Sequence, residues 1–89
     1  MRQPGFTNRF QKDLKRQKKR GKQSRKLETV ISAICLAGEA PVECRPHKLA
    51  GNWSGYLECH IDPDWLLIYT VDDESVLFYR TGSHSDLFS

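Results

Sequence analysis

Three histidines and one aspartate are the side chains of this 89-residue sequence best suited to catalysis: His47, His60, Asp64 and His84. An imidazole has a reference pKa of about 6.5, so it serves as either acid or base at cellular pH. Cleavage of an RNA phosphodiester needs a base for the 2′-hydroxyl, an acid for the leaving 5′-oxygen and a cation beside the anionic transition state. Side chains of these types supply all three functions, provided that the fold brings them together.

Three short segments rich in aromatic and β-branched residues are expected to position this group as strands. They are Tyr56 to Ile61, Trp65 to Val71 and Val76 to Thr81. Short acidic turns separate them, so we expect an antiparallel meander, with the second segment, apolar at both parities, in the centre. The tail after the third strand then emerges beside the first turn. This topology brings four residues to one end of the sheet: His60, Asp64, Trp65 and His84. The spacing of His47 leaves open whether it reaches the same end.

Aromatic and cationic side chains near that end are suited to holding single-stranded RNA. Trp65 and Phe88 can stack on unpaired bases, and Arg80 lies a few residues before the tail. Structural alternatives stay open for three residues: Trp65 as an anchor of the sheet edge, Arg80 as an ion-pair donor, and Asp64 as a turn residue. A metal site built from the histidines and Asp64 is a weaker alternative, because no pair has a recognised ligand motif.

Two amphipathic helices are expected before the strands. Over Thr7 to Arg20 the apolar residues recur every four positions, and Gly21 ends the pattern. A second helical pattern begins at Ser24, which we expect to be its N-cap, and Gly38 closes it. The two patterns predict a helical hairpin over about 7–38.

The expected fold class is α+β, with the helical hairpin packed on a small, mostly antiparallel sheet. A loop over 39–55, rich in Pro, Gly and Ser, connects the hairpin to the strands and tail of 56–89. Residues 1–89 are therefore expected to form one domain, since the length suits one hydrophobic core.

The formal net charge of +3 hides a strong asymmetry. Residues 1–26 contain eleven Lys and Arg against Asp13 alone, a net charge of +10, whereas residues 27–89 contain three basic and ten acidic residues, a net charge of −7. The basic segment has too little apolar surface for a membrane-surface helix. Contact with a nucleic-acid backbone is the preferred interpretation; a solvated helix face or a nuclear-localisation-like segment are the alternatives.

Composition argues against several other classes. No apolar run approaches the roughly 20 residues of a membrane span, and the N-terminal residues do not resemble a signal peptide, so we expect a cytoplasmic protein without a membrane partner. Cys35, Cys44 and Cys59 are odd in number and form no Cys-x-x-Cys pair. They are therefore expected to be reduced, hydrophobic side chains rather than disulfides or zinc ligands.

Three separated motifs, in order behind the helical hairpin, resemble the YafQ-type toxins of the RelE/ParE superfamily. The motifs are His47 to Tyr56, His60 to Tyr69 and Arg80 to Phe88. The resemblance covers nearly the whole chain after residue 5 and implies a RelE-like fold. It also implies a bacterial mRNA interferase of a type II toxin-antitoxin system, which binds in the ribosomal A site, cuts the mRNA there and stops translation. No metal or other cofactor is implied.

The resemblance assigns roles by position. The catalytic group would be His47, His60, Asp64 and His84, and the mRNA site would be lined by Trp65, Arg80 and Phe88. We expect His84 and Asp64 to transfer protons, with the other two histidines orienting groups or stabilising the phosphate. Ribosomal RNA would contact the basic helices, through Lys12, Lys15, Arg16, Lys18, Lys19, Arg20 and Lys22.

The implied partners are the ribosome and a cognate antitoxin. The antitoxin would neutralise the toxin, and the complex of the two would repress their operon. Operator DNA would therefore be bound only through that complex. One departure is visible: the family opens with a β-strand, whereas Met1 to Gly5 is short, polar and interrupted by Pro and Gly. Two other functions compete: a ParE-like inhibitor of a protein target such as DNA gyrase, and a non-catalytic RNA-binding protein.

Overall fold

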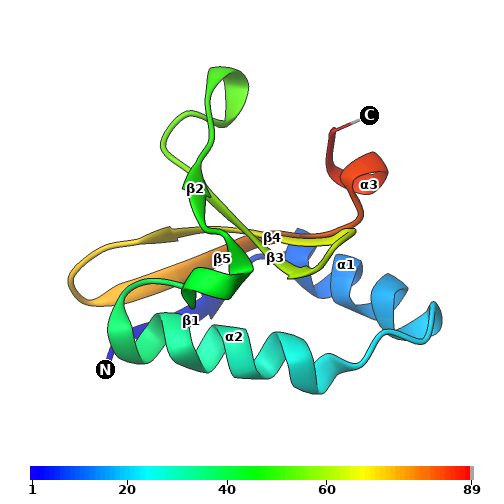
Figure 1. Ribbon diagram of the computed structural model, residues 1–89, viewed down its shortest axis with the longest axis horizontal. Helices are drawn as coiled ribbons and strands as arrows, with labels where there is room; N and C mark the ends of the chain where they lie inside the picture. The colour runs from blue at the N-terminus through cyan, green and yellow to red at the C-terminus, as the bar shows by residue number, and fades with distance from the viewer. Residues whose placement is uncertain (89) are drawn as a thin grey trace.

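A computed structural model describes residues 1–88 and shows three helices and a five-stranded sheet (Figure 1). The helices are α1 (Asn8–Lys19), α2 (Ser24–Ala37) and α3 (His84–Phe88). The strands are β1 (Gln3–Phe6), β2 (His47–Lys48), β3 (Leu57–Asp62), β4 (Trp65–Val71) and β5 (Ser75–Gly82). Two 3₁₀ turns, η1 (Val42–Cys44) and η2 (Gly51–Trp53), flank β2. The predicted α+β class is confirmed.

The strand order is β1-β5-β4-β3-β2, so β4 is central, as predicted. All neighbours pair antiparallel except β1 and β5, which are parallel. Figure 1 shows α1 and α2 on one side of the sheet, whereas α3 and the loop that carries β2 extend from the other. The sheet therefore has a helix-covered face and an outer face, and the site is built on the outer one.

Both long helices begin and end within one residue of their predicted bounds. The Thr7 hydroxyl accepts a hydrogen bond from the Phe10 N–H at 3.0 Å and caps α1. Gly38 ends α2 with φ of 81°, a left-handed conformation that favours glycine. The predicted N-cap of α2 is wrong: Gln23 is the extended residue before the helix, and Ser24 is already its first helical residue.

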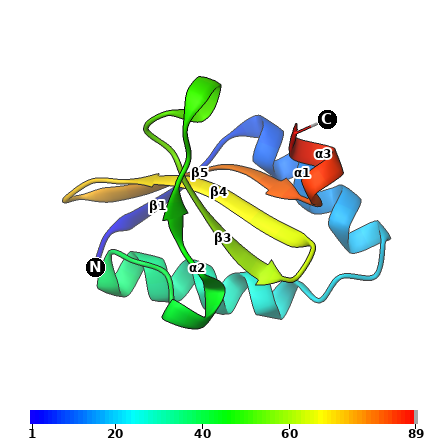
Figure 2. The same ribbon diagram turned by 45° about the horizontal axis from the view of Figure 1, so that its top comes forward.

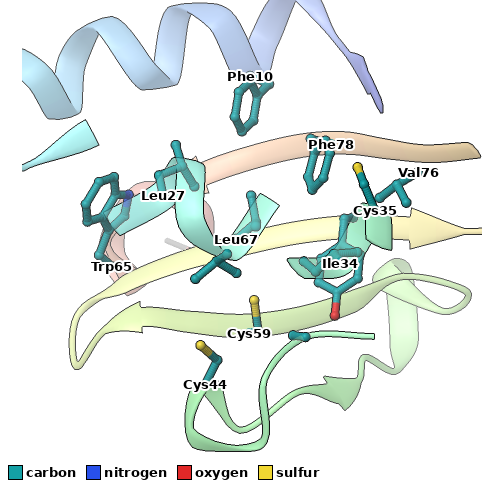
Figure 3. Close-up of a cluster of buried hydrophobic side chains, with 13 residues drawn as sticks. Phe10, Leu27, Ile34, Cys35, Cys44, Cys59, Trp65, Leu67, Val76 and Phe78 are labelled. Atoms are coloured by element: carbon teal, nitrogen blue, oxygen red, sulfur yellow. The ribbon is translucent and has the colours of Figure 1, made fainter. Parts of the chain in front are cut away.

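The main core lies between the helix-covered face and the hairpin (Figure 3). Alternate residues of β4 face it, and all are at most 1% exposed: Trp65, Leu67 and Tyr69. The other residues of that strand, Leu66 and Ile68, face the outer side and pack with Leu87 of α3. Because both sides of β4 are covered, its continuous apolar sequence is explained.

The three cysteines are buried and free, as predicted. Their side chains belong to the main core, where they pack as small hydrophobes.

The N-terminal residues form a strand despite their composition. β1 pairs with β5 from Gln3 opposite Ser75 to Phe6 opposite Phe78. Pro4 is tolerated because β1 is an edge strand. The family's opening strand is therefore present.

The segment 39–55, predicted as a loop, contains β2 and both 3₁₀ turns. The tail, for which no element was predicted, forms α3. A capping box starts this helix: the Asp86 N–H donates to the Ser83 hydroxyl at 3.1 Å, and the Ser83 N–H donates to the Asp86 carboxylate at 2.9 Å.

Candidate active site

Asp64 and His84 meet at the end of the sheet although they are 20 positions apart. The backbone N–H of His84 donates to Asp64 Oδ1 at 3.0 Å, so the carboxylate caps the start of α3. Both residues are exposed. The tail therefore emerges beside the β3–β4 turn, as the meander predicts, and brings the exposed residue His84 to the exposed Asp64 carboxylate.

His60 lies on the same face of the sheet as α3. In the ladder it pairs with Leu66, and Glu58 pairs with Ile68. Directly paired residues point to the same face, and Leu66 and Ile68 pack with α3 on the outer side. His60 and Glu58 are therefore on the outer face, where His84 begins the helix.

His47 reaches this group through β2, which the sequence left open. Its cross-strand partner is Glu58, and its ring centroid is 6.4 Å from that of His60. His47 Nε2 is 3.2 Å from the Glu58 carboxylate, and Nδ1 is 3.2 Å from the carbonyl oxygen of Arg45. Both partners are acceptors, so only the imidazolium form can donate to both. The His47 ring is thus held between a backbone carbonyl and the buried Glu58 carboxylate.

The His60 ring has a different hydrogen-bonding environment. Its Nδ1 is the one buried side-chain polar atom among residues 1–88 without a partner. An N–H buried there would be an unsatisfied donor, whereas a bare nitrogen leaves only an acceptor unpaired. We therefore assign the proton of neutral His60 to Nε2, which can donate a hydrogen bond to a substrate.

Phe88 and His84 lie side by side, with ring centroids 5.0 Å apart. Phe88 is half-buried and also contacts Trp53, whose ring centroid is 6.1 Å away. Phe88 therefore lies at the same end of the sheet as His84, while its contact with a base stays a prediction.

Comparison with known proteins decides the family. The sequence matches the family described as "Bacterial toxin of type II toxin-antitoxin system, YafQ" over residues 2–89. This chain belongs to the YafQ toxin family. It is 36% identical to the mRNA interferase toxin YafQ of Escherichia coli K12 over 84 residues, which covers 93% of this chain and 91% of that protein.

Solved structures agree with this assignment. The E. coli DinJ-YafQ toxin-antitoxin complex contains a chain of 35% identity and TM-score 0.89, matched over 99% of this chain and 98% of that one. A copper-bound mutant toxin from Helicobacter pylori has 34% identity and TM-score 0.91, over 99% of this chain and 100% of that one. The YafQ fold predicted from the motifs is confirmed over the whole chain.

Trp65 does not line the candidate site, and that prediction is wrong. Its side chain is fully buried on the helix-covered face, beside Leu27 (Figure 3). Its Nε1 donates to the Thr81 hydroxyl at 2.8 Å, and this hydroxyl donates to the Leu66 carbonyl at 2.8 Å. The anchoring alternative holds, because an indole with no exposed surface cannot stack on a base.

Arg80 also has a structural role instead of a free phosphate contact. Its guanidinium donates to the Asp13 carboxylate from Nε at 2.6 Å and from Nη2 at 3.1 Å. The Thr81 N–H donates to the same carboxylate at 3.3 Å. Asp13, the lone acid of the basic segment, is 3% exposed. The ion-pair alternative therefore describes Arg80, and it joins α1 to β5.

The basic side chains of α1 and the residues just after it form two sets. Lys12, Lys15, Lys18 and Lys19 are exposed along α1, and Lys22 is half-buried after it. Arg16 and Arg20 instead contact the Asp86 carboxylate of α3, with the shortest N–O distance 2.6 Å, from Arg20. Both arginine side chains remain exposed while they contact Asp86, so their predicted contact with RNA stays a prediction.

Glu58 and Asp86 are the residues that sequence reasoning missed. Glu58 carries no local signal, since its role depends on a two-residue strand that only the structure reveals. Asp86 does carry one: the spacing Ser83-x-x-Asp86 is that of a capping box and indicates a helix start.

The histidines and acids do not converge as a metal centre. Within residues 1–88, no group of three or more His, Cys, Asp and Glu side chains is placed to hold a metal ion. In the same range, no helix combines the length and apolar character of a membrane span.

Proposed function

We propose that this YafQ-family toxin is an endoribonuclease that cleaves mRNA on the ribosome and so inhibits translation. The observation that carries the proposal is that one side of the sheet carries three features: the Asp64 carboxylate bonded to the backbone N–H of His84, His47 beside the Glu58 carboxylate, and the His60 ring. Relatives of 36% identity over 91% of their length are mRNA interferases by name. The enzyme class follows from that similarity together with this set of groups.

The proposed reaction is intramolecular attack by the 2′-hydroxyl on the adjacent phosphorus. One member of the Asp64–His84 pair accepts the hydroxyl proton, and the other delivers a proton to the leaving 5′-oxygen. The bond from phosphorus to the 5′-oxygen breaks, which leaves a 2′,3′-cyclic phosphate. This division of labour suits the geometry, because both residues are exposed and the Asp64 carboxylate accepts a hydrogen bond from the backbone N–H of His84.

The other two histidines are suited to electrostatic roles. His47 lies between a carboxylate and a carbonyl oxygen, and in its protonated form it would present a positive charge on this face of the sheet. His60 offers an Nε2–H donor. Preorganised donors of this kind stabilise the charge that develops on the phosphate oxygens in the transition state.

Mapping of 5′ ends on a translated mRNA tests the proposal. Wild-type toxin should produce specific cuts, and His84→Ala and Asp64→Asn should each reduce them on the order of 10²- to 10⁴-fold, the contribution of one positioned proton-transfer group. Asp73→Asn is the matched control, since Asp73 is exposed in the β4–β5 turn. Full growth inhibition by His84→Ala and by Asp64→Ala would refute the nuclease mechanism and favour a binding inhibitor.

We further propose that the exposed lysines of α1 contact ribosomal RNA. Lys12, Lys15 and Lys19 follow helical spacing of i, i+3 and i+7, so they share one face of the helix. Each phosphate contact contributes up to about 0.9 to the slope of log K against log salt. The triple Gln variant should bind ribosomes more weakly, with a shallower salt dependence and an unchanged circular dichroism spectrum.

A cognate antitoxin is the second proposed partner. The E. coli relative was solved in a DinJ-YafQ toxin-antitoxin complex, and this chain matches its fold over 99% of its length. We propose that the corresponding antitoxin neutralises this toxin in the cytoplasm and binds operator DNA together with it.

A further inference from the structure

The carboxylate of Asp86 joins α3 to α1 as well as capping its own helix. It accepts from the Arg20 guanidinium at 2.6 and 3.1 Å, from the Gln17 side chain at 3.2 Å, and from the Ser83 N–H at 2.9 Å. Arg16 adds a longer contact of 3.5 Å. Figure 2 shows α3 lying next to α1 at the same end of the molecule. One side chain thus satisfies donors from two separate elements.

We propose that Asp86 is a positioning residue, which locks α3 against the end of α1 and so holds His84 in its working place. The inference rests on the proposed nuclease function, because it concerns the placement of His84. The proposed role of Asp86 involves no contact with the substrate or with the His84 ring. Asp86 positions His84 through α3, the helix that both residues share.

The small size of α3 makes such a lock necessary. A helix of five residues is not stable alone, since helix nucleation is unfavourable. Among the described residues of the helix Leu87 alone is buried, so apolar packing supplies limited attachment. Phe88 adds a ring contact with Trp53, Asp64 caps the first residue of the helix, and Asp86 supplies the polar contacts to α1 and Arg20.

The backbone before α3 shows the same close fit. A Cβ added at Gly82 would lie 2.9 Å from Asp86 Cβ and 3.0 Å from its Oδ2. The end of β5 and the carboxylate therefore approach as closely as a glycine allows. The Asp86 side chain is 11% exposed in its ion pair with Arg20. Hydrogen bonds from Arg20, followed by those from Ser83 and Gln17, hold the pKa of Asp86 well below its usual range, so the group is ionised throughout the neutral range.

Charge and reach can be separated by two substitutions. Asp86→Asn removes the charge while keeping the shape, whereas Asp86→Glu keeps the charge and the residue type usual in a capping box. The readouts are the single-turnover cleavage rate at saturating toxin and the dissociation constant of the toxin from programmed ribosomes. Asp73→Asn makes the same change of charge on an exposed turn and is the control.

We expect Asp86→Asn to lower the saturating rate about tenfold without changing the dissociation constant, because a lost cap and charge-assisted pair reduce the docked population of α3 by roughly that factor. Asp86→Glu should restore most of the rate. A wild-type rate in Asp86→Asn, or an equal loss in Asp86→Glu, would overturn the proposal.

Hydrogen exchange on the free toxin keeps the test independent of cleavage. The Leu87 N–H donates to the Ser83 carbonyl at 3.2 Å, and the His84 N–H donates to Asp64. Protection of both amides should fall in Asp86→Asn and in Arg20→Gln, and should persist in Asp73→Asn. Unchanged protection in both variants refutes the lock. A wild-type protein that cuts no mRNA refutes the nuclease function instead, while the exchange data still decide what Asp86 does.

Discussion

Replacing Asp13 with alanine should lower the free energy of unfolding by about 3 kcal/mol. Removing one partner of a buried ion pair typically costs about 3–5 kcal/mol, because the other charge stays buried and unpaired. Asp13 is 3% exposed and accepts two hydrogen bonds from Arg80 and one from the Thr81 N–H. The Arg80 side chain is 14% exposed, so water relieves part of the penalty and the lower end of the range applies.

Urea unfolding followed by circular dichroism measures this loss directly. Thermal unfolding gives the same loss as a change in Tm. For a domain of this size 1 kcal/mol shifts Tm by roughly 4–8 °C, so the expected fall in Tm is on the order of 12–24 °C. Total stability of such a domain is only about 5–15 kcal/mol. The variant should therefore stay folded at room temperature with a clearly lower midpoint.

Two further variants make the measurement decisive. Asp73→Ala removes an exposed acid and should change stability by no more than about 0.5 kcal/mol. The double variant Asp13→Leu with Arg80→Met replaces both charges by apolar groups and should recover most of the loss. If Asp13→Ala loses less than about 1 kcal/mol of free energy of unfolding, Arg80 is hydrated without its partner, and the buried-pair argument is wrong.

Two predictions follow from the other shifted groups. The pKa of Asp86 is lowered, chiefly by the Arg20 hydrogen bonds. Its contribution to stability is therefore complete above the ordinary aspartate pKa of about 4 and is lost as pH falls toward the folded-state pKa. The free energy of unfolding of Asp86→Asn, measured by acid titration, should accordingly depend less on pH than that of the wild type below about pH 4. Burial raises the pKa of the Cys59 thiol to about 12. Iodoacetamide at pH 8 should label Cys59 only after unfolding, and rapid labelling of native protein, read by mass spectrometry, would contradict its burial.

The parts of the fold that sequence predicted well are those with local causes. The β4 run is apolar at both parities because both faces are covered, and Thr7 caps α1 through a hydroxyl three residues from its donor. The meeting of Asp64 and His84 follows from two tight turns, which leave the chain few alternatives. Periodicity and turn chemistry are sufficient for these features.

The features that sequence reasoning missed depend on partners far along the chain. Nothing near Trp65 or Arg80 decides between substrate contact and a structural role, because that choice depends on a hydrogen bond to Thr81 and an ion pair with Asp13. β1 contains Pro4 and Gly5, whose local preferences oppose a strand, and only its pairing with β5 overrides them. The residue types were informative, whereas the direction in which each side chain points was decided by packing.

The contacts that close the structure join its first elements to its last ones, and this has a consequence for folding during synthesis. β1 pairs with β5, Asp13 reaches Arg80 across 67 positions, and Arg20 reaches Asp86 across 66. Loops of that length make folding slow, since closure entropy precedes any gain from the contacts. A nascent chain that has released α1 and α2 from the exit tunnel still lacks β5 and α3. We therefore expect a translating ribosome to hold this toxin inactive, with the catalytic arrangement completed only after residues 75–86 emerge.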